Sequence, residues 1–406
     1  MNIHNIVYYN MKHMSSTESM FYFLEEDEAQ CYLAQLIIGA FLVCLSPVNR
    51  MRDNKFKNIS FDYLPIPDYT GNSPEFPEVM DTIAKNLWDT NDKISILWSG
   101  GIDSTAAATA LIRNCDDWKQ RLRFLYTDTS ILEYEQFYSN FVSKAEDSRE
   151  VSEKDLFERE VPAALLDSLV TSGECGDQIF GSMILAKDPE SMTRSYKEII
   201  DWDNLITNNT DVTNLGGPQH RFLFEKSGSI LKDYMFNYLE EQIKLCPFEC
   251  TTVFDFFWWL NYSMKWNLCV YRALTKCVLP QPFNIDNWYP FYNAPELHQW
   301  SIDYHDKKVA IGGDWKTYKQ PAKDYIYELD GDKEYLKEKI KTASLSLQTR
   351  TYSGHVSMID ANGYCSPFIW MPYLEVQLDG MLTRDNLDWS STPRQYDMRW
   401  ENFKYF

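Results

Sequence analysis

The chain has 406 residues, with a hydrophobic content of 44% and an aromatic content of 15%. This amount of apolar material excludes a disordered chain, and the length suffices for two or three folded units. Lys and Arg number 39 against 59 Asp and Glu, which gives a formal net charge of −20. Nucleic acid is therefore disfavoured as the principal partner, because the overall field of the protein repels phosphate.

The cysteines and the apolar runs indicate the cellular location. Nine cysteines without a regular spacing favour thiols in a reducing compartment, so we expect a cytoplasmic protein. Cys246 and Cys250 form a C-x3-C pattern without a second pair, which favours thiols over a zinc site. The N-terminal residues lack the pattern of a secretory signal. The longest apolar run, residues 32–45, is shorter than the about 20 residues that span a bilayer, so we expect no membrane partner.

A proline-rich stretch suggests where the chain divides. Prolines cluster within residues 65–77, and because proline breaks helices this stretch is typical of an extended connector. We therefore expect a small N-terminal domain over residues 1–85, a central domain over 86–335 and a C-terminal extension over 336–406.

The central part begins with alternating strand and helix signals. The expected strands are residues 92–98, 123–126 and 164–171, and the expected helices are residues 105–112 and 138–160. Strands separated by helices indicate an α/β fold with a parallel sheet. From about residue 230 the pattern becomes helical and aromatic, and the run 254–260 is expected to pack in the core.

The most informative segment is SGGIDST, between an expected strand and an expected helix. Two adjacent glycines let backbone amides approach an anion, and a helix N-terminus adds the positive end of its dipole. The phosphate-binding residues that this predicts are Ser99, Gly100, Gly101, Ser104 and Thr105. Asp103 repels phosphate and suits Mg²⁺ instead. A tight turn with a capped helix is the less favoured alternative for this segment.

A second candidate segment is SGECGDQIFG, which follows the third expected strand. Glu174 and Asp177 lie three positions apart, in a turn that contains Gly173 and Gly176. With Asp103 they predict a set of three carboxylate ligands for Mg²⁺. Alone, the segment fits equally a glycine-rich turn with solvated acids.

These motifs together resemble a known family. SGGIDS resembles the pyrophosphate-binding loop of the PP-loop ATP pyrophosphatases, and SGECGDQIFG is similar to the S-G-E-G-x-D-E-x-F-G-G pattern of the asparagine synthetase family. Trp288 to Asn293 is similar to the family's R-V-P-F-L-D segment, and Lys319 to Lys323 is similar to its K-x-x-L-R. The resemblance covers about residues 90 to 330, the region of the synthetase domain.

The resemblance implies a parallel-sheet, adenine nucleotide alpha-hydrolase-like fold with a helical C-terminal part. It also implies that the protein binds ATP and Mg²⁺. The implied reaction adenylates a carboxylate, releases pyrophosphate and forms an amide with ammonia or an amine. The resemblance also implies that Lys319 contacts the phosphates and that Lys323 assists Lys319. Because ligands of open parallel sheets bind beyond the carboxyl ends of the strands, we expect adenine near Leu97, Tyr126 and Thr127.

The chain also departs from the family. Asn2 stands where the family's glutaminase domain has its cysteine nucleophile, so a separate glutaminase is one expected partner. Gln178 replaces a Glu, Cys175 a Gly, and Trp288 and Asn293 an Arg and an Asp. Two alternatives therefore stay open: a PP-loop enzyme that modifies nucleotides or tRNA, and an ATP-binding module without turnover.

Overall fold

The structure is a computed structural model whose described residues fall in several ranges. These are residues 50, 64–181, 189–199, 240–264, 266–271, 273–274, 277, 285–309, 316–339, 355–359 and 365–369. The run at 32–45, most of the expected N-terminal domain and most of the C-terminal extension lie outside them. Within these ranges, no helix has the length and apolar character needed to cross a membrane.

A four-stranded sheet forms the centre of the fold. Its strands are β1 (Ile94–Leu97), β2 (Leu122–Tyr126), β3 (Asp147–Glu150) and β4 (Leu169–Ser172), in the order β3-β2-β1-β4. Every neighbouring pair is parallel, with Ile94 opposite Leu122 on one side and Leu169 on the other. The expected α/β fold with a parallel sheet is thus confirmed. Two further strands, β5 (His355–Ile359) and β6 (Cys365–Ile369), pair antiparallel.

Helices make up most of the remaining described residues. The α-helices are α3 (Phe76–Thr90), α4 (Ile102–Arg113), α5 (Trp118–Arg121), α6 (Asp128–Glu133), α7 (Glu135–Asn140), α8 (Glu153–Asp155), α9 (Val161–Asp167), α10 (Gly176–Phe180), α12 (Tyr196–Ile199), α16 (Val253–Met264), α17 (Trp266–Tyr271), α18 (Pro295–Asp303), α19 (Gln320–Asp330) and α20 (Lys333–Glu338). Short 3₁₀ turns are η2 (Val142–Lys144), η4 (Pro189–Met192), η6 (Ile285–Asn287) and η7 (Phe291–Asn293), and η3 (Leu156–Glu160) is a π-helical turn.

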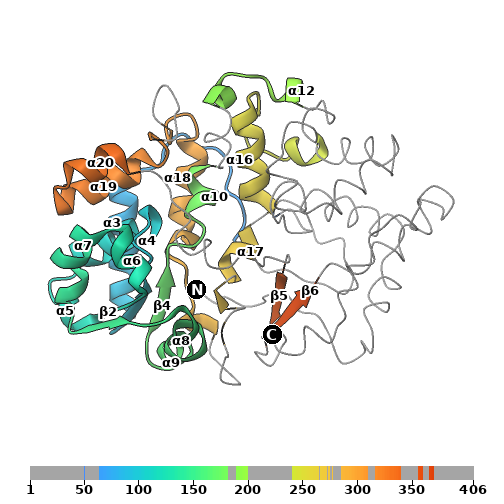
Figure 1. Ribbon diagram of the computed structural model, residues 1–406. Helices are drawn as coiled ribbons and strands as arrows, with labels where there is room; N and C mark the ends of the chain where they lie inside the picture. Colours follow the sequence, from blue (N-terminus) through green and yellow to red (C-terminus); the bar gives the residue numbers. More distant parts are fainter. Residues whose placement is uncertain are drawn as a thin grey trace, which may run out of the picture.

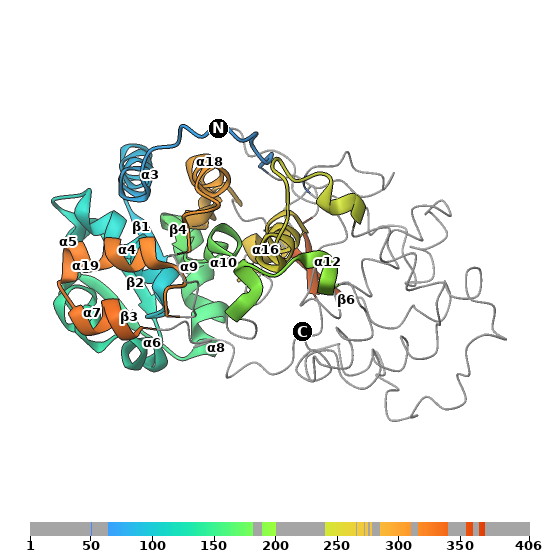
Figure 2. The same ribbon diagram turned by 90° about the horizontal axis from the view of Figure 1, so that it is seen from above.

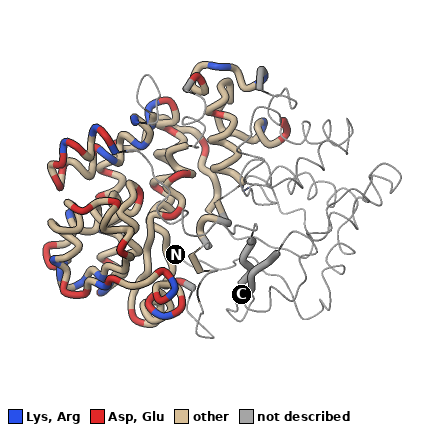
Figure 3. The backbone as a smooth tube through the Cα atoms, in the orientation of Figure 1, with Lys and Arg blue, Asp and Glu red and all other residues tan. Residues whose placement is uncertain are grey.

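The helices around α4 and those around α10 form two packed groups. Helix α4 packs against α3 and α19, whereas α10 packs against α16 and α18. Figures 1 and 2 both show α10 and α18 between α4 and α16. Helix α16 is the expected aromatic core segment: Trp258 and Trp259 are fully buried, which confirms that expectation. In Figure 3 this helix carries almost no charge, whereas both signs of charge alternate along the outer helices.

One expected strand is partly a helix. The sequence pattern predicts a strand over residues 164–171, but α9 continues to Asp167 and β4 begins only at Leu169. Pro162 is the second residue of α9, directly after the π-helical turn η3, and Ser168 at the end of α9 is extended, with φ −154°. A short apolar run does not by itself distinguish a buried helix from a buried strand, which explains the error.

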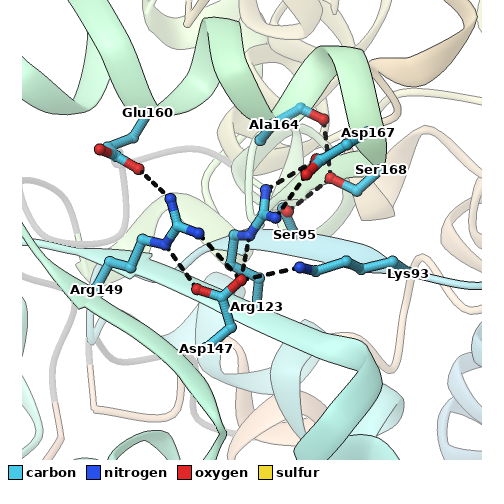
Figure 4. Close-up of polar contacts among 9 residues, drawn as sticks. All are labelled: Lys93, Ser95, Arg123, Asp147, Arg149, Glu160, Ala164, Asp167 and Ser168. Carbon is cyan, nitrogen blue, oxygen red and sulfur yellow. Dashed lines mark hydrogen bonds and ion pairs between the residues drawn. The ribbon is translucent and has the colours of Figure 1, made fainter.

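The charged stretch at 138–160, expected to be helical, contains the edge strand β3. Three of its four side chains are charged, and Asp147 bonds to Arg123 and Lys93 near the starts of neighbouring strands (Figure 4). Arg123 bonds to Asp147 at 2.7 Å and Asp167 at 2.8 Å, while Arg149 bonds to Asp147 at 2.6 Å and Glu160 at 2.8 Å. Long-range ion pairs thus stabilise a strand whose sequence lacks the usual apolar alternation, and charge protects its open edge.

The proline-rich connector packs against the central domain. Asp303 at the end of α18 accepts hydrogen bonds from the backbone amides of Thr70 at 2.7 Å, Gly71 at 2.9 Å and Ser73 at 3.2 Å. Helix α3 then runs without a break through position 85, where the sequence suggests a domain boundary. Helix α3 therefore belongs with the sheet, and the division of the rest of the chain stays a prediction.

Candidate functional site at the carboxyl edge of the sheet

The two motif segments meet where the adjacent strands β1 and β4 end. Leu97 pairs with Ser172, so the loops that follow the two strands leave the sheet side by side. Each loop leads into a helix, α4 after the first and α10 after the second. Two helix starts thus lie at the carboxyl edge of a parallel sheet, where such folds bind ligands.

The first loop is held by its own hydroxyl groups. The side-chain oxygen of Ser104 accepts from the backbone N–H of Ser99 at 3.1 Å, and the two serine hydroxyls lie 3.0 Å apart. Gly101 caps α4 without a side-chain hydrogen bond, and Thr105 donates the first helical bond, to Gly101 O at 3.0 Å. The amides of residues 102–104 therefore have no acceptor within the helix, which is the arrangement that binds anions.

Two glycines of the motifs are required by close packing. Gly100 has φ +73°, and a Cβ there would lie 2.2 Å from the carbonyl oxygen of Ser130. A Cβ on Gly173 would lie 2.4 Å from the amide nitrogen of Ser104. The second loop therefore touches the backbone of the first, at the start of α4.

Two carboxylates and one ammonium group converge beside these loops. Lys319 Nζ forms an ion pair with Asp103 Oδ2 and lies 2.6 Å from Asp177 Oδ1. Among the described residues, Asp103 Oδ1 is a buried oxygen without a hydrogen-bond partner. The convergence joins α4, α10 and the N-cap of α19, which are distant in sequence.

The backbone is strained at two points of this site. Within the described ranges, Cys175 with φ 71° and Lys319 with φ 61° are the non-glycine residues in the left-handed region. Cys175 is the N-cap of α10 and Lys319 is the N-cap of α19. Such conformations cost of order 1–3 kcal/mol each and concentrate at functional sites.

Burial tunes the groups around the carboxylates. Burial lowers the pKa of Lys319, and attraction to Asp103 together with their hydrogen bond offsets part of that effect. Tyr318 Oη donates to Asp177 Oδ1 at 3.3 Å, and Tyr292 Oη donates to the carbonyl oxygen of Asp103 at 3.3 Å. Burial raises the pKa of both tyrosines well above the ordinary value, so they remain hydrogen-bond donors.

Gln178, which stands where the resembled family has Glu, is explained by its neighbour. Asn261 Nδ2 donates to the carbonyls of Asp177 at 3.0 Å and Gly181 at 2.9 Å. Asn261 Oδ1 is left as an acceptor, and Gln178 Nε2 donates to it at 3.0 Å. A carboxylate at 178 could not make this donation.

Some predicted site residues have other contacts. Lys323 Nζ donates to the carbonyls of Lys316 and of Lys339, the latter at 3.4 Å, so it links α19 to its flanking segments. The Thr105 hydroxyl accepts from the Trp98 indole at 3.1 Å. Their parts in phosphate binding and catalysis stay predictions.

The predicted adenine-binding residues lie at the ends of β1 and β2. Leu97 is half-buried, and Tyr126 is buried. Thr127 caps α6, with its hydroxyl 3.2 Å from that of Ser130. Sequence reasoning missed Tyr292, Tyr318 and Asn261, because a single tyrosine or asparagine carries no chemical signal of its own in a sequence.

The carboxylates form a pair where the sequence predicts a set of three. In the part of the chain that the structure describes, no group of three His, Cys, Asp or Glu side chains is arranged to hold a metal ion. Asp103 and Asp177 share Lys319, and the predicted third ligand, Glu174, follows Gly173 in the half-buried part of the loop. Two carboxylates fit Mg²⁺, which takes its other ligands from phosphate and water.

No family model, no curated protein and no solved structure matches this chain. The function is therefore inferred from the geometry of the site and from the motifs that it contains.

Proposed function

We propose that the chain is an ATP-dependent, AMP-forming synthetase built on a PP-loop domain like that of the asparagine synthetase family. The observation that supports this is the convergence of the glycine loop before α4 with Asp103, Asp177 and Lys319 at one edge of a parallel sheet. Anion-binding amides, a carboxylate pair and a buried ammonium group are the parts that cleavage of a nucleoside triphosphate needs.

Each part has a role in the proposed reaction. The amides of residues 102–104 and the hydroxyls of Ser99 and Ser104 bind the departing pyrophosphate. Mg²⁺, held by Asp103 and Asp177 when bound, neutralises negative charge on the phosphates. Lys319 leaves the carboxylates and contacts the phosphate oxygens. Its charge there stabilises the transition state in which pyrophosphate departs.

The reaction proceeds in two steps. A substrate carboxylate attacks the α-phosphorus of ATP, which gives an acyl-adenylate and pyrophosphate. Ammonia or an amine then displaces AMP and forms an amide. Because Tyr292 and Tyr318 are buried donors beside the carboxylates, they hold Asp103 and Asp177 in place during both steps.

The test is carboxylate-dependent exchange of labelled pyrophosphate into ATP, screened over pooled carboxylic acids with Mg²⁺. We expect exchange with one pool and a loss of about 100-fold or more in Asp103→Asn and Asp177→Asn. The matched control is Asp116→Asn, which changes an exposed acid between α4 and α5 and should keep the wild-type rate. Unchanged exchange in both site variants would refute the assignment.

The second candidate is an ATP-binding module without turnover. One observation favours it: Lys319 already forms ion pairs with the two carboxylates that the proposed reaction assigns to Mg²⁺. ATP binding measured by calorimetry, with no pyrophosphate formed in any pool, would favour this module over the synthetase.

The proposed location is the cytoplasm. The described cysteines form no disulfide with one another, which fits a reducing compartment.

A further inference from the structure

A second concave site lies away from the carboxyl edge of the sheet. It is a cleft of ≈ 580 Å³ between the start of α12 and the turn that precedes α16. Both cysteines of the C-x3-C pattern, Cys246 and Cys250, line it. None of the site residues described above lines this cleft, so the two cysteines are separate from the proposed synthetase chemistry.

The two cysteines line the same cleft and differ in exposure. Cys246 is half-buried, whereas only 7% of Cys250 is exposed. The neighbouring Cys246 side chain, followed by burial, raises the pKa of the Cys250 thiol. Cys246 is therefore the sulfur that a reagent in the cleft meets first, and Cys250 lies behind it as a protonated thiol.

The backbone on both sides of the pair is held by hydrogen bonds. The amide of Cys246 donates to Ile243 O at 3.0 Å. The amide of Thr251, next to Cys250, donates to Asp255 Oδ2 at 2.9 Å, and His305 holds the other oxygen of Asp255 at 2.8 Å. Closing a bond between the two sulfurs thus costs little chain entropy.

The other described cysteines lack this arrangement. Cys115 is buried and donates to Asp117 at 3.0 Å, and burial together with that hydrogen bond raises its pKa to about 11. Cys175 is buried at the N-cap of α10, Cys269 is buried in α17, and Cys277 donates to the carbonyl of Ala273 at 3.4 Å. Within the described ranges, Cys246 and Cys250 are therefore the two thiols that share this cleft.

We propose that Cys246 and Cys250 form a reversible disulfide by exchange with a low-molecular-weight disulfide that enters this cleft. The Cys246 thiolate attacks the reagent disulfide, and a mixed disulfide forms while one small thiolate leaves. The Cys250 sulfur, after losing its proton to solvent, then attacks Cys246 and releases the second small thiol. Both protein sulfurs are oxidised and the reagent disulfide is reduced to two thiols.

The test uses the full chain, equilibrated in mixtures of reduced and oxidised glutathione. Remaining thiols are blocked with an alkylating reagent before digestion with trypsin. Cleavage after Lys244 and Lys265 places Cys246 and Cys250 on one peptide that contains no other cysteine. We expect this peptide to appear without alkyl groups and lighter by two hydrogen atoms, and dithiothreitol should restore double alkylation.

Two variants separate the roles of the thiols. In Cys250→Ser the reaction should stop at glutathione on Cys246, with at least about a ten-fold rise in that adduct, because no second thiol displaces it. In Cys246→Ser, Cys250 should react about ten-fold more slowly because it is buried. Cys277→Ser is the matched control, and it should leave the oxidised fraction unchanged.

Three outcomes would overturn the proposal. One is double alkylation of the wild-type peptide in excess oxidised glutathione. Another is a stable glutathione adduct on Cys246 that Cys250 fails to resolve. The third is stoichiometric zinc that copurifies with the chain and protects both thiols, which would make the pair a metal site.

Discussion

The ammonium nitrogen of Lys319 lies 2.6 Å from Oδ1 of Asp177, although the two residues belong to different helices. The same ammonium group also contacts Asp103, and none of the Lys319 side chain is exposed. A buried cation between two carboxylates offsets part of their negative charge, so its removal leaves two like charges facing each other. Under the proposed function, Lys319 and Mg²⁺ therefore compete for one place.

This competition gives the first prediction, for Lys319→Met. We expect the variant to lose about 3 kcal/mol of unfolding free energy without divalent cations, because a buried ion pair loses one partner. Millimolar Mg²⁺ should raise the melting temperature of the variant more than that of the wild type. Lys316→Met is the control, since Lys316 pairs with Glu338 at the surface and should show neither effect. Equal Mg²⁺ dependence in all three proteins would contradict the shared place.

The contact between Gln178 and Asn261 gives the second prediction. Gln178→Glu should cost about 2–3 kcal/mol of unfolding free energy, because it puts a carboxylate oxygen against the carbonyl oxygen of Asn261 in a buried position. The control is Gln120→Glu, where an exposed amide bonds to Glu146 and the cost should stay below about 0.5 kcal/mol. Chemical denaturation measures the unfolding free energy of both variants. Equal losses would show that the hydrogen bond from Gln178 to Asn261 does not contribute to stability.

The ion pairs at the starts of the strands give the third prediction. Arg123 is 4% exposed and joins Asp147 to Asp167, so Arg123→Met should destabilise the fold by about 3 kcal/mol. Arg149 is 41% exposed, and the same change there should cost less than about 1 kcal/mol.

The same pairs predict how stability depends on acid. Burial alone would raise the pKa of Asp147, but hydrogen bonds from Arg149, Arg123 and Lys93 hold it well below the ordinary value. This stabilisation is present above the unfolded pKa of about 4 and is lost as pH falls below it. Arg123→Met should therefore unfold with a smaller dependence on pH below 4 than the wild type; an unchanged dependence would refute the role of this pair.

The buried His305 gives the fourth prediction. Burial, helped by nearby Lys308, lowers its pKa to about 3, against the attraction of Asp255. In the unfolded chain the His305 imidazole binds a proton near pH 6.5, whereas in the folded chain it stays neutral at that pH. The free energy of unfolding therefore falls as pH drops from about 6 to about 4. The slope is about 1.4 kcal/mol per pH unit for this residue, and His305→Gln should remove it from denaturation curves. A slope equal to that of the wild type would show that His305 titrates normally.

The sequence by itself determines the elements whose signal is local. An apolar β-rich run, two glycines and an alanine-rich segment predict β1, its loop and α4, because strand, turn and helix propensities act over a few residues. The same holds for β2 and for the aromatic burial of α16. The carboxylates Asp103 and Asp177 are also identified this way, since each lies inside a glycine-containing motif.

Only the tertiary structure decides the rest. The charged strand β3 forms because Arg123 and Lys93, from neighbouring segments, neutralise Asp147, and no local pattern contains that information. Likewise the left-handed turn that buries Lys319 between two acids depends on Asp103 of α4 and Asp177 of α10 being brought to one place. These features rest on contacts between distant segments, and their energy exists only once the chain has brought those segments together.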